Sequence, residues 1–106
     1  MGQVAEELKQ RLERGDATIG VIGLGYVGLP LAVAFAKAGL PVIGLDVDAD
    51  RSARIRSGVS PVEDVPSDEL APLVTARRLV VADGIEALTA ADAIIICVPT
   101  PLGKSK

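Results

Sequence analysis

The chain has 106 residues, a formal net charge of −3 and a sequence pI near 4.8, which suits one domain and argues against nucleic acid or an anionic membrane as a partner. Hydrophobic residues make up 49% but aromatic ones only 2%, so we expect an aliphatic core of buried strands beneath alanine-rich helices. The single cysteine, Cys97, excludes an internal disulfide, and the absence of histidine argues against a zinc site.

Residues 1–17 form a charged N-terminal extension without the apolar region of a signal peptide. Val4, Leu8 and Leu12 recur at helical spacing, which predicts an amphipathic helix that ends at Gly15. A frayed extension fits the same pattern equally well. No apolar run in the sequence approaches the roughly 20 residues of a membrane span, so we expect a cytoplasmic protein.

From residue 18 onward, apolar runs alternate with helical patterns. Buried strands are predicted at 18–23, 41–46, 78–83 and 92–99. Helices are predicted at 26–38, at 48–58, in a short segment from residue 67, and at 84–91. Leu31, Phe35 and Ala38 form one stripe of the first of these helices, and Asp48 and Ser67 are expected N-caps. This order predicts an α/β fold, a doubly wound parallel sheet with right-handed crossovers.

Three glycines stand where the first strand of this region meets its helix. GLGYVG, residues 23–28, matches G-x-G-x-x-G. A predicted buried strand precedes it and a predicted helix follows it, which is the context in which this pattern indicates dinucleotide binding. Gly23 would allow the tight turn, Gly25 the approach of a pyrophosphate to the backbone, and Gly28 close packing of the helix on the strand. Glycines that serve only a tight turn are the alternative.

Asp46 ends the second predicted strand, 18 residues after Gly28. Dinucleotide-binding folds carry an acidic residue about 20 residues on, which accepts hydrogen bonds from the adenosine ribose. A carboxylate there repels a 2′-phosphate, so NAD is favoured over NADP. Arg51 follows closely, and with Asp46 in place we expect it to stack on or border the adenine. A solvated helix residue is the alternative for Arg51.

Val98, Pro99, Thr100 and Pro101 follow the fourth predicted strand. Ligands of open α/β sheets lie beyond the carboxyl ends of the strands, so this segment should reach the same crevice as the glycines. The two prolines would hold the Thr100 hydroxyl in an extended loop. A rigid exit from the strand, without a ligand, is the alternative.

Other side chains are not expected to carry chemistry. Cys97 lies in a strand predicted to be buried, which favours a core thiol over a nucleophile. The acidic residues Glu63, Asp64, Asp68 and Glu69 are interpreted as a solvated loop cluster, because no helix is expected to place two of them on one face. The sequence therefore predicts no catalytic residue and no metal site in this chain.

GLGYVGLP together with VPTPL resembles the NAD-binding domain of the UDP-glucose/GDP-mannose dehydrogenase family, the nucleotide-sugar 6-dehydrogenases, over residues 18–106. The resemblance implies a Rossmann-type domain there, incomplete and truncated before the family's central and C-terminal domains. It implies NAD contacts by the backbone of Tyr26 and Val27, and by Asp46, Arg51 and Thr100. The full-length protein would be a homodimer.

Members of this family oxidise the C6 alcohol of a nucleotide sugar to a carboxylate with two NAD. Residues 62–70 keep Glu63 but lack the Pro-Gly that usually follows in UDP-glucose enzymes, which favours UDP-N-acetylglucosamine or UDP-N-acetylmannosamine over UDP-glucose as the substrate. The family's nucleophilic cysteine corresponds to sequence beyond Lys106, so this chain alone is expected to be inactive. A non-catalytic NAD-binding module and a β-hydroxyacid type of dehydrogenase are the alternatives, and VPTPL argues against the second.

Overall fold

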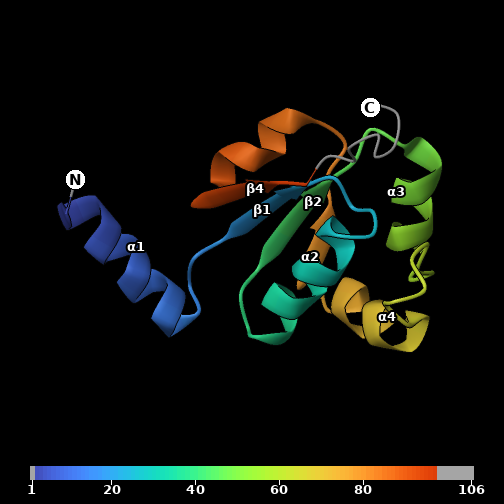
Figure 1. Cartoon of the computed structure of the whole chain (residues 1–106), viewed down its shortest axis with the longest axis horizontal. Coiled ribbons are helices and arrows are strands. Elements are labelled where there is room, and N and C mark those ends of the chain that lie inside the picture. The colour runs from blue at the N-terminus through green and yellow to red at the C-terminus, as the bar shows by residue number, and fades with distance from the viewer. Residues whose placement is uncertain (1, 98–106) are drawn as a thin grey trace, which may run out of the picture.

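The computed structural model describes residues 2–97, which fold around one four-stranded parallel sheet (Figure 1). The elements in chain order are α1 (Gly2–Arg14), β1 (Ile19–Ile22), α2 (Gly28–Lys37), β2 (Val42–Leu45), α3 (Ala49–Arg56), α4 (Ser67–Thr75), β3 (Leu79–Val81), the 3-10 helix η1 (Ile85–Ala90) and β4 (Ala93–Ile96). The strand order is β3-β2-β1-β4, and every neighbouring pair is parallel. The predicted α/β fold with a parallel sheet is confirmed.

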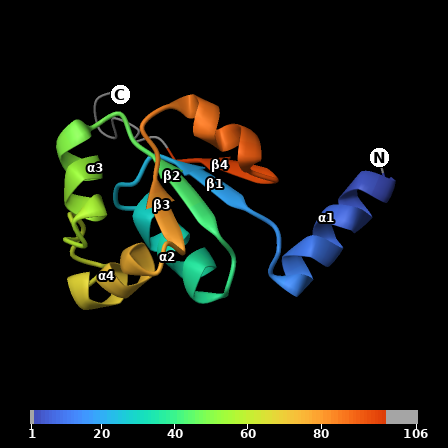
Figure 2. The same ribbon diagram turned by 180° about the vertical axis from the view of Figure 1, so that it is seen from behind.

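The two faces of the sheet are covered differently. Helices α2, α3 and α4 pack on one face, where the inward side chains of the three strands β1, β2 and β3 are buried, and η1 lies on the other (Figures 1 and 2). The second face is also aliphatic, because Ile22, Ile43, Leu45 and Val80 alternate along the strands with the buried residues, and each of them is only partly buried. Within residues 2–97, the helical layer is therefore thick on one side and thin on the other.

The fourth strand is not buried, contrary to the sequence prediction. β4 lies at one edge of the sheet beside β1, and Ile94 and Ile96 remain 48% and 65% exposed. The apolar sequence of β4 resembles that of a central strand. Within residues 2–97, however, only η1 packs on the face of the sheet that carries Ile94 and Ile96, and it covers only part of that face. Cys97, directly after β4, is accordingly only partly buried, so the prediction of a buried core thiol is wrong in its degree of burial.

Helix α2 buries a different stripe from the predicted one. Its buried side chains include Leu29, Ala32, Val33 and Ala36, whereas Phe35 is only partly buried against the core and Ala38 is exposed. Both stripes have helical spacing, and the glycine turn before the helix determines which of them faces the sheet. Alanine at two of the four positions lets the helix axis approach the strands closely.

Helices α3 and α4 begin with different caps. Asp48 caps α3 as predicted, since its carboxylate accepts from the Arg51 N–H at 3.0 Å. Helix α4 begins at Ser67, but the Ser67 hydroxyl accepts from the Ser60 N–H at 2.9 Å, and the helix has no side-chain cap. The predicted capping role of Ser67 is therefore wrong, because the hydroxyl closes the preceding loop.

Helix α1 projects from the sheet at the end opposite the glycine turn (Figures 1 and 2). It ends where predicted, at Gly15, and Arg11 in its last turn pairs with the Asp92 carboxylate. Asp92 also accepts from the Thr18 N–H at 2.7 Å, and this bond, assisted by Arg11 and opposed by burial, holds the pKa of Asp92 below its ordinary value. Asp92 thus connects α1, the start of β1 and the start of β4.

Candidate functional site

Two of the three glycines of the predicted motif serve the packing of the turn between β1 and α2. Gly23 has φ +94°, and a Cβ there would overlap the main-chain carbonyl of Cys97. A Cβ on Gly28 would overlap the carbonyl of Gly23, lying 2.7 Å from its carbon atom. Only glycine fits at both positions, so the chain makes a tight turn and α2 packs directly against the end of β1.

Gly25 has no such packing role. A Cβ built on Gly25 would meet no protein atom within 4 Å, and its φ is not positive. Within the described residues, the N–H groups of Gly25, Tyr26 and Val27 have no hydrogen-bond acceptor, and no side chain caps α2. The side chains of Tyr26 and Val27 are 78% and 69% exposed. The turn therefore presents unpaired donors at the positive end of a helix, as an anion-binding turn does.

Asp46 lies beside this turn, at the carboxyl end of β2, with a side chain only 3% exposed. Its Oδ2 accepts from the Leu24 N–H at 2.6 Å, and its Oδ1 accepts from the Asp48 N–H at 2.8 Å. Burial of the carboxylate raises its pKa, but the hydrogen bonds from these two N–H groups and from Arg51 outweigh burial, so the pKa of Asp46 lies below its ordinary value. The carboxylate is therefore ionised and fixed in place.

Arg51 also binds Asp46. The Nη1 atom of Arg51 lies 3.1 Å from each carboxylate oxygen of Asp46. A carboxylate offers about four acceptor positions, and the two backbone N–H groups with the bifurcated Arg51 contact use them all. Asp46 thus joins the glycine turn, the turn after β2 and helix α3, which the sequence spacing alone did not reveal.

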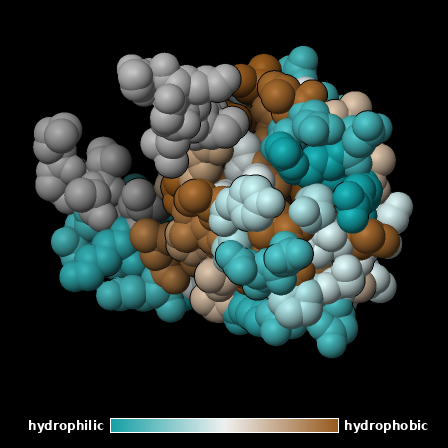
Figure 3. Space-filling view, turned by 45° about the vertical axis from the view of Figure 1, so that its right-hand side comes forward, coloured by the Kyte–Doolittle hydropathy of each residue, from teal (hydrophilic) through white to brown (hydrophobic). Residues whose placement is uncertain are grey.

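A pocket of about 240 Å³ opens between the glycine turn and α3. It is lined by Gly25, Tyr26, Asp48, Asp50, Arg51, Arg54, Pro61 and Val62. Half of these residues are charged, in keeping with the hydrophilic surface on the side of the molecule that carries α3 (Figure 3). The pocket brings together Gly25, Tyr26 and Arg51, three of the residues that the sequence predicts to bind the cofactor.

The sequence interpretation missed five of these residues. For Arg54 a signal was present, since it follows Arg51 by three positions on the predicted helix and so shares its face. For Pro61 and Val62 there was none, because only the folded loop between α3 and α4 carries them to the glycine turn.

Several predicted site residues do not contribute to this geometry. Val98, Pro99, Thr100 and Pro101 lie outside the described residues. The acidic residues from Glu63 to Glu69 are exposed. Two of them, Asp68 and Glu69, stand on α4, the helix predicted from residue 67, and not in a loop, and Glu69 pairs with Lys37 at 2.6 Å. Within residues 2–97, no group of three side chains is arranged to hold a metal ion, and no helix is long and apolar enough to span a membrane.

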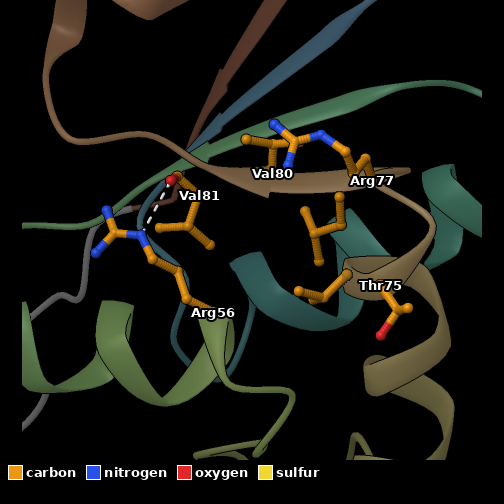
Figure 4. Close-up of a pocket in the computed structure, with 7 residues that line it drawn as sticks. Arg56, Thr75, Arg77, Val80 and Val81 are labelled. Atoms are coloured by element: carbon orange, nitrogen blue, oxygen red, sulfur yellow. Dashed lines mark hydrogen bonds between the residues drawn. The ribbon is translucent and has the colours of Figure 1, made fainter.

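A larger pocket, of about 400 Å³, lies at the outer edge of β3, away from the glycine turn. Figure 4 shows Arg56 reaching from α3 to this edge, where its Nε donates to the Val81 carbonyl at 3.2 Å. Arg56 also donates to the Ala82 carbonyl and pairs with Asp83 at 2.6 Å. Arg56 therefore covers exposed carbonyls of an edge strand, which is a common protection against unwanted strand pairing.

This chain is similar in sequence and in fold to known proteins. UDP-N-acetyl-D-mannosamine dehydrogenase of Pyrococcus horikoshii is 40% identical over 85 residues, which are 79% of this chain and 20% of that protein. UDP-N-acetyl-D-glucosamine 6-dehydrogenase of Pseudomonas aeruginosa is 37% identical over 91 residues, 86% of this chain and 21% of that protein. The chain thus spans about a fifth of the length of the curated relatives it matches.

Among solved structures, GDP-mannose dehydrogenase from Pseudomonas aeruginosa, in a ternary complex, superposes with a TM-score of 0.74 at 36% identity. That match covers 82% of this chain and 20% of the other. Residues 17–106 match the NAD binding domain of the UDP-glucose/GDP-mannose dehydrogenase family. The chain therefore belongs to the UDP-glucose/GDP-mannose dehydrogenase family, and what it carries of that family is the NAD-binding domain.

Proposed function

We propose that residues 18–106 of this chain form a unit that binds NAD, as one part of a longer homodimeric enzyme. That enzyme would use NAD to oxidise the C6 alcohol of a UDP-N-acetylhexosamine to a carboxylate. The observation that supports the proposal is Gly25. It is free of any packing role, it stands among unpaired N–H groups, and it lies beside a buried, ionised carboxylate at the end of β2.

The residues present fit NAD. A pyrophosphate would take the N–H groups of Gly25, Tyr26 and Val27, where a Cβ on Gly25 would otherwise fill the space. The ribose hydroxyls would donate to Asp46, and Arg51 would then turn from the carboxylate to border the adenine, because both oxygens are otherwise fully used. Bound NAD supplies the hydride acceptor, while the chain binds it and fixes its orientation.

The cofactor part of the proposal is tested by titrating NAD and NADP against the parent chain and the Asp46→Ala variant, using isothermal calorimetry. The parent should prefer NAD, because a 2′-phosphate cannot donate to Asp46 and is repelled by it. The variant should lose the preference. Equal or tighter binding of NADP by the parent would refute the role given to Asp46.

The substrate class is supported by two relatives, whose names give UDP-N-acetyl-D-mannosamine and UDP-N-acetyl-D-glucosamine as their substrates. We expect the complete polypeptide that carries this chain to form NADH with one of these UDP-sugars more efficiently than with UDP-glucose. Absorbance at the NADH band, recorded across the three sugars, measures this. Absence of turnover with all three would overturn the substrate proposal while leaving NAD binding to be judged by calorimetry.

A further inference from the structure

The pocket beside Gly25 contains two arginines, which differ in what they already bind. Arg51 is bound to Asp46 through two contacts of 3.1 Å, so its charge is largely compensated. Arg54, one turn further along α3, has an exposed side chain, and its Nη2 donates to the Ser60 carbonyl at 3.5 Å. In the described part of the chain, no carboxylate lies within ion-pair distance of Arg54.

The other charges of the pocket make Arg54 important for an anionic ligand. Asp48 and Asp50 also line the pocket, and Arg51, whose Nη2 lies 4.0 Å from Asp48 Oδ2, is shared between Asp48 and Asp46. Without Arg54 the two carboxylates that line the pocket would face a single arginine that also serves Asp46, and the excess of negative charge would repel a phosphate group. With Arg54 present, one cation stands in the same pocket as the unpaired N–H groups at Gly25.

We infer that Arg54 is a further cofactor-binding residue, whose guanidinium pairs with the pyrophosphate of the dinucleotide that lies against Gly25. The inference rests on the proposed binding of NAD in this pocket. A guanidinium is suited to the task because its planar donors match phosphate oxygens in pairs. The pyrophosphate would then be bound from two sides. The backbone N–H groups of the turn are fixed in position, whereas the Arg54 side chain can change its rotamer to reach the phosphate oxygens.

Stacking on adenine is the competing role for Arg54, since Pro61 and Val62 give the pocket an apolar wall. The two roles differ in their chemistry. Pairing with pyrophosphate depends on charge, is partly retained by lysine and weakens with salt. Stacking depends on the flat guanidinium, is lost with lysine and acts equally on a ligand without phosphate.

The test uses the 106-residue chain as the parent, with Arg54→Gln, Arg54→Lys and the control Arg77→Gln. Arg77 is exposed and lines the distant pocket at β3, so its replacement removes the same charge elsewhere. Chemical-shift titrations with NAD and with adenosine are run at low and high salt. Arg54→Gln should weaken NAD binding about tenfold at low salt, which corresponds to about 1.4 kcal/mol, and should flatten its salt dependence. Arg54→Lys should recover most of the loss, and adenosine binding should not change.

Four results would overturn the inference. Equal loss of NAD and adenosine binding without rescue by lysine would assign Arg54 to the adenine. Binding of NAD by Arg54→Gln as tight as by the parent, or a loss matched by Arg77→Gln, would remove any specific role. Failure of the parent itself to bind NAD would refute the proposed function and not only the role of Arg54. Urea denaturation of each variant verifies that the fold is intact.

Discussion

Replacing Gly25 and Gly28 by alanine, one at a time, should separate cofactor binding from folding. At Gly28 the new methyl group would overlap the Gly23 carbonyl, with its carbon 2.7 Å away, and the obstacle is backbone that cannot rotate aside. At Gly25 the methyl group would meet nothing within 4 Å, and φ there is not positive. The same chemical change therefore falls on two glycines of one turn with opposite surroundings.

The expected magnitudes follow from these surroundings. Gly28→Ala should lower the free energy of unfolding by about 1–3 kcal/mol or more, as overpacking does, and each kcal/mol lowers the melting temperature by about 4–8 °C in a domain of this size. Gly25→Ala should leave the free energy of unfolding unchanged or raise it by up to about 1 kcal/mol, because alanine restricts the unfolded chain. Its methyl group occupies the approach of the pyrophosphate, so NAD binding should weaken at least about tenfold, or about 1.4 kcal/mol.

Urea denaturation measures the first effect and calorimetric titration with NAD the second. The reasoning would be refuted if Gly25→Ala destabilised the chain as much as Gly28→Ala, because Gly25 would then have a packing role. Undiminished NAD binding by a well-folded Gly25→Ala chain would refute the assignment of this turn to the pyrophosphate.

Four further substitutions test other parts of the structure. Asp46→Asn should reduce the loss of stability that the parent chain shows at acid pH. Because the pKa of Asp46 is lowered in the folded chain, its carboxylate stabilises the fold above about pH 4, and this stabilisation is lost as the pH falls through the pKa of the folded state. Urea denaturation of both chains from pH 6 to pH 2 would measure the difference. Arg56→Ala should lower the free energy of unfolding by about 1 kcal/mol, because carbonyls at the edge of β3 lose their donor; an unchanged urea midpoint would contradict this. Gly20→Val should destabilise the chain by about 1–3 kcal/mol, because a Cβ there lies 3.0 Å from Leu88 Cδ2, and it should speed amide exchange in η1. Asp50→Asn should tighten NAD binding, since it removes a negative charge from the pocket, and calorimetry showing weaker binding would contradict this.

Features that depend on neighbouring residues could be predicted from the sequence. The order of strands and helices, the Asp48 cap and the stop at Gly15 were all evident, because periodicity and caps act within a few positions. The turn at Gly23 was evident for the same reason, since a strand followed by G-x-G-x-x-G and a helix leaves one backbone path.

Features that depend on distant contacts could not be predicted. The exposure of Ile94 and Ile96 is decided by what covers their face of the sheet, and an apolar run is the same on an edge strand as on a central one. The need for glycine at position 20 likewise depends on a distant contact, because η1 packs on it and Leu88 would lie 3.0 Å from a Cβ there. The bond from the Leu24 N–H to Asp46 joins residues 22 positions apart, which spacing rules for ribose recognition do not include.

That bond links the two ends of the proposed adenosine diphosphate site, so that neither end can move independently of the other. Leu24 directly precedes Gly25, and its N–H is held at 2.6 Å by the carboxylate expected to receive the ribose. A change at the ribose end therefore alters the backbone that faces the pyrophosphate. Free-energy losses from substitutions at Asp46 and at Gly25 should not add up as those of distant, independent sites do, because the first substitution already releases the turn on which the second acts.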